Sequence, residues 1–383
     1  MIKVATLVFG LFALFYGPAL SETYYVAPLG AVASGTPDGT EARPFTSIDT
    51  ALKSGKVKGG DTLLLKDGAY GAVTIKANAA FDVPLTIMSQ NTKSAQMDNI
   101  LLSGSTRNII LRNLSVWPSD PEKGLNFLIR AYTTTSDITL DGLDVRSDKF
   151  AEGYRQWDAA KWEKRKYSGI LLEGPRGVVL NSRLIGINHG ILVSRESRVV
   201  GNTIIGYNGD GMRASSGSLV KGNRVYDCVS TNGNHDDGFQ GLSDETAPLK
   251  NLVLDSNIIL EWTGPSEHPL RCSLQGIGFF GGFHENIRII NNVVSVSAHH
   301  GISIYGVRHA VIINNTVVHS KGHTLGYPYI AVFDSEKYVS VSMDVLVANN
   351  VAMRLVGQAT PFDSVIFLNN SVVGTPSLVF ENP

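Results

Sequence analysis

Residues 199–226 read VVGNTIIGYNGDGMRASSGSLVKGNRVY, and this stretch decides the fold of the chain. Within it, Asn202 and Asn223 lie 21 residues apart, and each follows a short apolar run. A repeat of this length is typical of solenoid proteins, in which each repeat forms one coil and stacks on the next. The stretch therefore predicts one coil of a repetitive, stacked structure.

Two lines of residues recur at this interval or at longer intervals that include a loop. The first line is polar, ends each apolar run and comprises Asn113, Gly142, Ser182, Asn202, Asn223, Asn257, Asn292, Asn315, Asn350 and Asn370. The second line opens the next run and comprises Gly169, Gly190, Gly211, Gly238, Gly276 and Gly301. Because asparagine tolerates left-handed backbone and can hydrogen-bond its copy in the next coil, the polar line predicts a stacked row at a tight bend. We therefore predict an all-β chain, folded as a single-stranded right-handed parallel β-helix of about ten coils.

The repeat runs without a linker, which indicates one elongated domain. We assign residues 84–383 to the β-helix and residues 22–83 to an N-terminal cap. In the cap, Ser47 stands as a helix N-cap before the apolar Ile48 and Leu52, which predicts a short amphipathic helix. Such a helix would cover the open hydrophobic end of the solenoid.

The first residues have the pattern of a secretory signal. Lys3 is followed by an apolar stretch over residues 4–16 and by the small-residue sequence Ala-Leu-Ser at 19–21. We predict a signal peptide over residues 1–21, and an uncleaved anchor is the alternative. The mature protein is then expected to be secreted or periplasmic, monomeric and not inserted in a membrane.

Charge is nearly balanced, with 33 Lys and Arg against 34 Asp and Glu, and the formal net charge is −1. No overall field would therefore hold nucleic acid or an anionic membrane. An acidic substrate would need a local basic patch.

The chain has two cysteines, Cys228 and Cys272. In an oxidising compartment they could bridge neighbouring coils. Two separate buried thiols that pack as small hydrophobic groups are the equal alternative.

Three insertions interrupt the short period, at residues 147–167, 261–274 and 321–328. Long loops on a rigid scaffold commonly carry binding groups. The aromatic and basic residues of these loops, including Trp157, Lys164 and Arg271, would suit a sugar chain that bears carboxylates. The alternative for the first insertion is a solvated helix that packs its tryptophans on the solenoid.

Alignment on the glycine line shows where polar chemistry gathers. The residue before each glycine reads Ser168, His189, Asp210, Asp237, Gln275 and His300, and the second residue after it reads Leu171, Leu192, Arg213, Gln240, Gly278 and Ser303. Copies in stacked coils lie about 4.8 Å apart. We expect both positions to project outward, so that Asp210, Asp236 and Asp237 crowd together beside Arg213. Carboxylates at that spacing repel one another, so that one takes up a proton or a cation binds between them.

The stretches at 208–213, 222–228 and 235–240, which read NGDGMR, GNRVYDC and HDDGFQ, resemble the calcium-binding coils of family-nine pectate lyases. This match covers about 35 residues, and residues 23–88 are also similar to the amino-terminal part of that family and of alginate and chondroitin lyases. The resemblance implies a secreted β-helix enzyme that cleaves acidic polysaccharide by β-elimination. It also implies that Asp210, Asp236 and Asp237 bind Ca²⁺, with Gln240 at the fourth ligand position.

The sequence departs from this family at the catalytic base, because the family's lysine falls at or near Gly278. Arg213 is one replacement, although its high pKa makes proton abstraction demanding. His300 or His189 is another, since imidazole titrates near neutral pH. In each case the substrate carboxylate must be neutralised by Ca²⁺ or by Arg213. Gln275 is expected to bind substrate beside these groups.

Three other functions remain open. Asp210, Asp236 and Asp237, together with the segment HHGISI at 299–304, resemble polygalacturonase-type hydrolases, in which carboxyl groups protonate the leaving oxygen and activate water. Uronate C5-epimerisation would begin with the same proton abstraction as a lyase. A non-catalytic carbohydrate-binding β-helix would explain the missing lysine.

Overall fold

The computed structural model of the chain describes residues 21–373 except for 32–34, 77–78, 123, 125, 234, 242–246, 266, 321–326, 339 and 359–363. The predicted signal peptide therefore lies outside the described residues, apart from its last position. Among the helices of the described part, none combines the length and apolar character that crossing a membrane requires.

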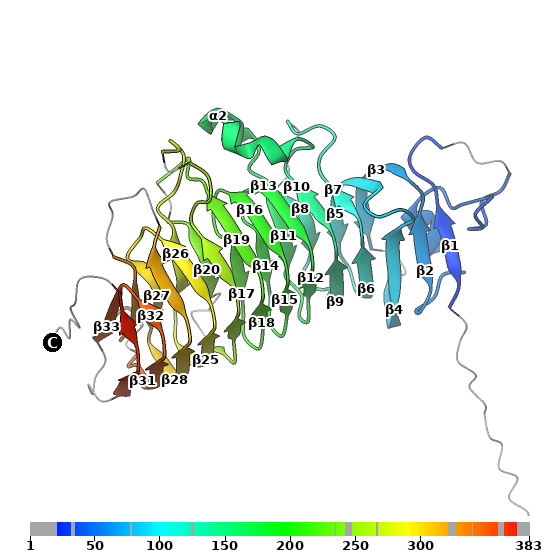
Figure 1. Cartoon of the computed structure of the whole chain (residues 1–383). Helices are drawn as coiled ribbons and strands as arrows, with labels where there is room; N and C mark the ends of the chain where they lie inside the picture. The colour runs from blue at the N-terminus through cyan, green and yellow to red at the C-terminus, as the bar shows by residue number, and fades with distance from the viewer. Residues whose placement is uncertain are drawn as a thin grey trace, which may run out of the picture.

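The chain winds into a right-handed parallel β-helix, which confirms the predicted fold, and its coils form an elongated stack (Figure 1). Each typical coil supplies one short strand to each of three parallel ladders. The first ladder comprises β1 (Thr23–Val26), β2 (Thr62–Leu65), β4 (Ala80–Ser89), β6 (Arg107–Arg112), β9 (Ser136–Asp141), β12 (Val178–Leu180), β15 (Arg198–Val200), β18 (Leu219–Lys221), β22 (Val253–Asp255), β25 (His284–Ile290), β28 (Val307–Ile313), β31 (Met343–Ala348) and β34 (Val365–Leu368). A short extra strand, β21 (Leu249–Lys250), also pairs with β25.

The other two ladders join through β5 into one sheet. The second ladder comprises β3 (Gly68–Ile75), β5 (Ala95–Leu102), β8 (Phe127–Ala131), β11 (Ser168–Leu172), β14 (Ile191–Val193), β17 (Met212–Ala214), β20 (Asp237–Gly241), β24 (Gln275–Phe279), β27 (His300–Tyr305), β30 (Tyr329–Phe333) and β33 (Arg354–Gln358). The third ladder comprises β7 (Ser115–Val116), β10 (Asp144–Arg146), β13 (Arg183–Ile187), β16 (Thr203–Tyr207), β19 (Arg224–Cys228), β23 (Ile258–Leu260), β26 (Val293–Val296), β29 (Thr316–His319), β32 (Val351–Ala352) and β35 (Ser371–Val372).

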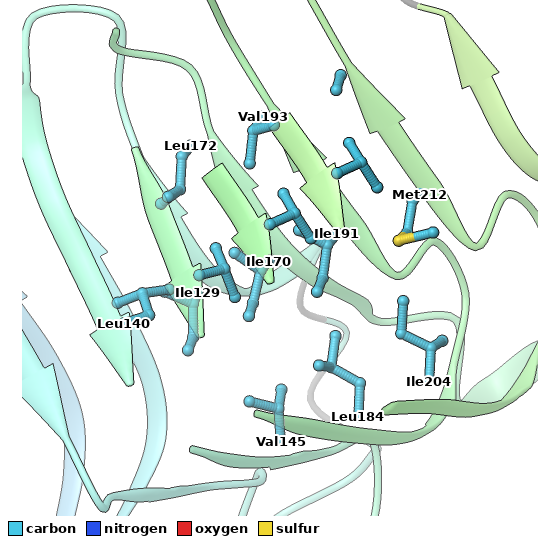
Figure 2. Close-up of a cluster of buried hydrophobic side chains, with 14 of the residues drawn as sticks. Ile129, Leu140, Val145, Ile170, Leu172, Leu184, Ile191, Val193, Ile204 and Met212 are labelled. Carbon is cyan, nitrogen blue, oxygen red and sulfur yellow. The ribbon is translucent and has the colours of Figure 1, made fainter. Parts of the chain in front are cut away.

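The core is a set of stacked apolar columns inside these ladders. Parallel register places like residues above one another, as Figure 2 shows for Ile129, Ile170, Ile191 and Met212. All four are almost fully buried. Because alternate side chains of a strand point to opposite faces, the residues between them remain outside and are free to carry chemistry.

An asparagine ladder runs along the bend between the first and third ladders. In each pair of successive members, the backbone N–H and the Nδ2 of one asparagine donate to the Oδ1 of the next at 2.9–3.0 Å. The members are Asn202, Asn223, Asn257, Asn292, Asn315, Asn350 and Asn370. The predicted stacked row is therefore confirmed over these coils.

The first two members of the predicted polar line were placed wrongly. Asn113 and Gly142 have φ values of 55° and 69°, and they align with Gly201 and Gly222, which precede the ladder asparagines. The left-handed residue and the ladder asparagine are thus neighbours with different tasks. The first makes the turn, and the second satisfies buried backbone N–H groups across coils.

Loss of one ladder amide should be costly. In Asn223→Ala, the buried N–H of Asn202 would lose its acceptor and the carbonyl of Val199 would lose the Nδ2 donor at 2.8 Å. We expect the free energy of unfolding to fall by about 2–3 kcal/mol, because unsatisfied buried polar groups carry their full desolvation cost. Denaturant unfolding measures this. Asn181→Gly is the control, since Asn181 is exposed with φ of 48° and glycine adopts that conformation freely; equal losses in both variants would contradict the assignment.

The glycine line is confirmed by close backbone approach between coils. A Cβ added at Gly190 would lie 2.1 Å from the carbonyl oxygen of Gly211, and one added at Gly276 would lie 2.2 Å from that of Gly301. Any side chain at these positions would therefore push neighbouring coils apart.

The N-terminal segment forms the predicted helix, α1 (Ile48–Lys53), with Ser47 as N-cap accepting from the backbone N–H of Thr50 at 3.0 Å. Its buried face, which includes Ile48 and Leu52, packs into the main core. Strands β1 and β2 nevertheless belong to the first ladder. The segment predicted as a cap thus also contributes strands to the solenoid.

The insertion at 147–167 forms the 3₁₀ helix η1 (Ala151–Gln156) and α2 (Ala159–Lys164), which stand beside the solenoid near β10 and β13 (Figure 1). Trp157 and Trp162 meet edge to face at 5.1 Å between ring centroids, in a cluster that also holds Tyr154 and Trp262. The alternative interpretation, tryptophans packed on the solenoid, is therefore the observed one.

The two cysteines form a disulfide, which confirms the first of the two alternatives. Cys228 ends β19, Cys272 lies in the loop before β24, and their Cα atoms are 5.5 Å apart. The bridge ties the 261–274 loop to the solenoid beside Asp236.

Candidate functional site

The predicted row of residues before the glycines is present at the corner where the third ladder passes into the second. The N–H of Gly190 donates to the carbonyl of Asp210 at 2.9 Å, and that of Gly211 donates to the carbonyl of Asp237 at 2.8 Å. Asp237 is also in register with Gln275. His189, Asp210, Asp237 and Gln275 therefore follow one another on successive coils.

The carboxylates of this row are buried, and the expectation that they project into solvent is wrong. The exposed fractions of Asp210 and Asp237 are 1% and 2%. Neighbouring side chains cover the two carboxylates, and the groups next to them that reach solvent include Arg213, 30% exposed, and His189, 27% exposed. The surface of the site consequently presents the guanidinium of Arg213 and the imidazole of His189, and its acidic groups form a lower layer.

Asp210 is the centre of the lower layer. Its carboxylate forms an ion pair with the guanidinium of Arg213, and its Oδ1 accepts the backbone N–H of Asp237 at 3.1 Å. Its own N–H donates to Nδ1 of His189 at 3.0 Å, and that nitrogen lies 3.6 Å from Oδ2. Asp210 therefore positions both side chains that reach the surface.

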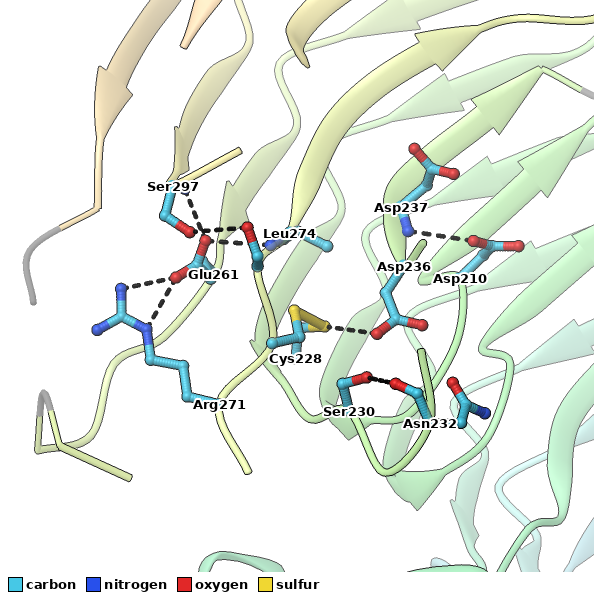
Figure 3. Close-up of a disulfide and its surroundings, with 12 residues drawn as sticks. Asp210, Cys228, Ser230, Asn232, Asp236, Asp237, Glu261, Arg271, Leu274 and Ser297 are labelled. Atoms are coloured by element: carbon cyan, nitrogen blue, oxygen red, sulfur yellow. Dashed lines mark hydrogen bonds and ion pairs between the residues drawn. A yellow bond between two sulfur atoms is a disulfide. The ribbon is translucent and has the colours of Figure 1, made fainter. Parts of the chain in front are cut away.

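Asp236 points away from this cluster. Consecutive residues of an extended backbone project to opposite sides, and Figure 3 shows Asp236 turned toward the disulfide while Asp237 lies on the other side. The contact of 3.7 Å between Cys228 Sγ and Asp236 Oδ2 is not a hydrogen bond, because a disulfide sulfur carries no hydrogen. Burial and the charge of Asp210 raise the pKa of Asp236 to about 7. Asp236 therefore interacts electrostatically with the other two carboxylates, as predicted, but its side chain faces the disulfide and not the Asp210–Arg213 pair.

The pKa of Asp237 is raised, which favours its protonated form at neutral pH. Burial, and next the charge of Asp210, raise its pKa to about 8, although Arg213 opposes the shift. Its Oδ1 is buried without a hydrogen-bond partner among the described residues. A protonated carboxyl at this place can act as a general acid.

The raised pKa values of Asp236 and Asp237 predict that the folded protein loses stability as pH increases. Between their ordinary pKa of 3.8 and the folded values near 7 and 8, the native state holds protons that the unfolded chain releases. His300, with a lowered pKa of about 4, acts in the opposite sense up to its ordinary 6.5. From about pH 6.5 to about pH 8 the free energy of unfolding should therefore fall, and Asp237→Asn should flatten the fall. Denaturant midpoints across this range measure it; an identical slope in the variant would refute the shift.

The predicted calcium ligands do not form one site. Among described residues, the one group of three His, Cys, Asp or Glu side chains with donor atoms within 4.8 Å of one another is Cys228, Asp236 and Cys272. Two of these are disulfide sulfurs, which are not thiolate ligands. Arg213 already supplies a cation to Asp210, so Asp210, Asp236 and Asp237 as arranged do not fit a single Ca²⁺. Calcium binding stays an untested prediction, and no step of the reaction below uses it.

Gln240 lies on β20 in register with Arg213 and Gly278, and its side chain is half-buried. A lysine at position 278 would require the ring of Phe280 to move, because a Cβ there would lie 2.1 Å from its Cε2. The ring of Phe280 instead covers this point of the strand.

His300 belongs to a separate group. The coil of Gln275 stands between it and Asp237, a separation of about 10 Å for two coils. Its Nδ1 lies 2.9 Å from Ser303 Oγ and 3.0 Å from the hydroxyl of Tyr329. Burial and the nearby His299 and His235 lower its pKa to about 4, so the ring is neutral at neutral pH. His300, predicted as one possible base, therefore lies two coils away from Asp237 and apart from the Asp210–Arg213 pair.

The three loop residues predicted to bind substrate have other partners. Trp157 is 5% exposed, with Trp162 on one side and Lys161 Nζ 4.8 Å from its centroid, so its ring is not open to a sugar. The Arg271 side chain is 2% exposed and pairs with Glu261 at 2.7 Å. Lys164 is exposed on α2, where its Nζ lies 3.6 Å from Glu122. The first two are structural, which corrects their assignment.

Sequence reasoning missed the aromatic residues beside His300, namely Tyr305, Tyr329 and Phe333. The signal that located the other columns was the glycine line, and it stops at Gly301. The next coil has Tyr329 and Ile330 without a glycine, and the register shifts between His300 and Ile302. Continued alignment on Tyr329 could have found the row.

No protein-family model matches the sequence, and no curated protein matches it. Many solved structures match this chain, and three of them illustrate the shared fold. They are the A-module of the mannuronan C-5 epimerase AlgE6 of Azotobacter vinelandii (TM-score 0.56, 14% identity, 92% of this chain and 95% of that chain), a mannuronic acid specific polysaccharide family 6 lyase from human gut microbiota (0.54, 13%, 92% and 82%) and the Dettilon tailspike protein gp208 (0.53, 11%, 90% and 68%). At these identities the likeness shows the β-helix fold alone. None of the three is a family-nine pectate lyase, so that resemblance stays a prediction.

Proposed function

We propose that this chain is an enzyme that cleaves an acidic, uronate-containing polysaccharide by β-elimination. One observation carries the proposal: the carboxylates are buried under a surface of Arg213 and His189, so the site presents a cation and an imidazole to its substrate. Such a surface suits a carboxylate-bearing sugar. Two of the proteins with a similar fold are named for action on uronate polymers, which is in keeping with this substrate class.

The proposed reaction begins at the substrate carboxylate. Arg213 pairs with it and stabilises the negative charge that develops when the neighbouring C5–H bond breaks. His189 accepts the proton. Its pKa is lowered by burial, so the ring is neutral at neutral pH. At present His189 Nδ1 accepts the Asp210 N–H and lies 3.6 Å from Asp210 Oδ2. If the ring moved so that Nδ1 donated to Oδ2 instead, the ring proton would be on Nδ1. The other nitrogen, Nε2, would then be free to act as the base.

Elimination is completed at the glycosidic oxygen. As the C4–C5 double bond forms, the C4–O4 bond breaks and the leaving oxygen needs a proton. Asp237 stands one coil beyond Asp210, on the side opposite His189, and its raised pKa favours the protonated form. Because its carboxyl is buried, a water would relay its proton to the leaving oxygen. Asp210 thereby lies between the proposed acid, Asp237, whose pKa is raised, and the proposed base, His189, whose pKa is lowered.

The test is an assay of residues 22–383 on pectate, alginate and chondroitin sulfate, with and without EDTA. We expect chain cleavage with the ultraviolet absorbance of a C4–C5 unsaturated product, and we expect it to persist in EDTA. Loss of activity in EDTA would restore the calcium prediction. Deuterium incorporation at C5 without cleavage would indicate an epimerase. No reaction on any polymer would favour a binding protein.

Hydrolysis is the second candidate, because a carboxyl with a pKa of about 8 can protonate a leaving oxygen in a hydrolase as well. The three carboxyl groups of the hydrolase hypothesis, Asp210, Asp236 and Asp237, nevertheless do not face one site, since Asp236 faces the disulfide. New reducing ends without unsaturation would establish hydrolysis and overturn the elimination.

A further inference from the structure

An aromatic surface follows the candidate site along the second ladder. We call it the aromatic stripe, and it consists of Phe280, His300, Tyr305, Tyr329 and Phe333. Neighbouring rings meet at centroid distances of 4.8–6.2 Å, from Phe280 against His300 at 5.1 Å to Tyr305 against Phe333 at 4.8 Å and Tyr329 against Phe333 at 6.2 Å. All five side chains are half-buried, so their edges or faces reach solvent.

The stripe lies over a floor of small residues. Gly278, Ser303 and Ala331 are in register on β24, β27 and β30, and all three are buried. Phe280 folds across Gly278, and Phe280 and Tyr305 meet at 5.8 Å. One row of rings is Phe280, Tyr305 and Phe333, and the other is His300 and Tyr329. The two rows are in contact with each other above the small side chains, so the rings form a continuous surface. A connected apolar surface of this kind on a soluble protein commonly marks a binding site.

Cations stand at both ends of the stripe. Arg213, on β17, lies two coils before the first ring of the stripe, and Arg354, in register with Tyr329, lies on β33 in the coil after its last strand, β30. The Nε of Arg354 is buried without a hydrogen-bond partner among the described residues. Five coil steps separate the two strands, or about 24 Å. Along the described strands between them, the outward positions hold Gln, His, Tyr, Phe, Ser, Ala and Gly, and the one acidic side chain in these rows, Asp237 at the start of β20, is buried.

We propose that the aromatic stripe binds the apolar faces of successive sugar units of an acidic polysaccharide, which runs along the solenoid axis with carboxylates at Arg213 and Arg354. The C–H faces of a pyranose pack on aromatic rings, and guanidinium groups bind carboxylates in a bidentate manner. The coil spacing of about 4.8 Å is close to the length of one sugar unit, so units and coils can remain in step. This subsite rests on the proposed function in one respect, the acidic polymer.

The test is isothermal titration with oligomers of mannuronate, guluronate and galacturonate, of about two to about eight units. It uses the His189→Gln background, which removes the proposed base so that oligomers are not consumed. Tyr305→Leu and Phe333→Leu remove a ring but keep apolar volume. We expect each to weaken binding of the longer oligomers of the preferred uronate about fivefold to tenfold and to leave the shortest ones unchanged.

Two controls give the test its meaning. Phe150→Leu removes an exposed ring outside the stripe and should bind as the background does, whereas Tyr305→Phe keeps the ring and should retain affinity. Wild-type affinity in Tyr305→Leu and Phe333→Leu, or absence of binding to every oligomer, would overturn the subsite. If the wild-type protein cleaves polymer but the stripe variants bind oligomers normally, the subsite proposal fails and the lyase proposal is unaffected. If the stripe variants bind oligomers more weakly but the wild-type protein cleaves no polymer, the subsite is established and the lyase proposal fails.

Discussion

Arg213→Gln is expected to lower kcat/KM on the preferred polyuronate by a factor of about 10² to 10³. The guanidinium is the cation that the structure presents at the surface of the site, and it is held in place by Asp210 beneath it. Removal of one preorganised group that stabilises developing negative charge has this size of effect in other enzymes. If Arg213 acts in the transition state, the loss will appear mainly in kcat; if it only binds substrate, KM will rise instead.

The controls separate charge from geometry and from folding. Arg213→Lys keeps the charge of Asp210's partner but loses the planar fork, so it should recover a part of the activity. Arg195→Gln removes an exposed arginine from a turn of a neighbouring coil and should behave as wild type. Circular dichroism shows whether each variant is folded. A folded Arg213→Gln protein with wild-type kcat/KM would place the substrate carboxylate elsewhere.

Arg271→Met is expected to reduce the free energy of unfolding by about 3–5 kcal/mol. Glu261 is fully buried, and its carboxylate accepts from Arg271 Nε at 2.8 Å and from the backbone N–H groups of Ser297 at 2.6 Å and Leu274 at 3.2 Å (Figure 3). Without the guanidinium, a buried negative charge would remain without its counter-ion. Denaturant unfolding gives the change directly.

A double variant shows whether the effect belongs to the pair. Glu261→Gln keeps a carbonyl oxygen for the two backbone donors and removes the charge, so Glu261→Gln/Arg271→Met should recover a part of the loss. Arg288→Met, at an exposed position on β25, serves as the control. If Arg271→Met costs no more than Arg288→Met, the ion pair does not hold the 261–274 loop.

The coil structure could be predicted because its requirements are local and repeated. Ladder asparagines such as Asn257 make the same hydrogen bonds in each coil from Asn202 onward, and Gly211 and Gly238 allow the same close approach of backbones. Repetition makes such signals visible without any knowledge of long-range contacts. The order of His189, Asp210 and Asp237 on successive coils followed directly from this alignment.

The orientation and burial of side chains could not be predicted in the same way. The row at Asp210 lies at a corner, where strand alternation does not decide between inside and outside, and Arg213 covers it. Trp157 and Arg271 looked like binding groups because the sequence does not show their partners, which lie in other segments of the chain. Phe280 could not be foreseen over Gly278, since only the packed structure shows which ring fills that space.

The disulfide between Cys228 and Cys272 also determines which metal ions can bind beside Asp236. Its two sulfurs and an oxygen of Asp236 lie within 4.8 Å of one another. If the bridge were reduced and the groups kept these places, two thiols and a carboxylate would form a donor set suited to zinc and other soft cations. Oxidation removes that donor set, so the redox state of its surroundings sets the sensitivity of this corner to heavy metals.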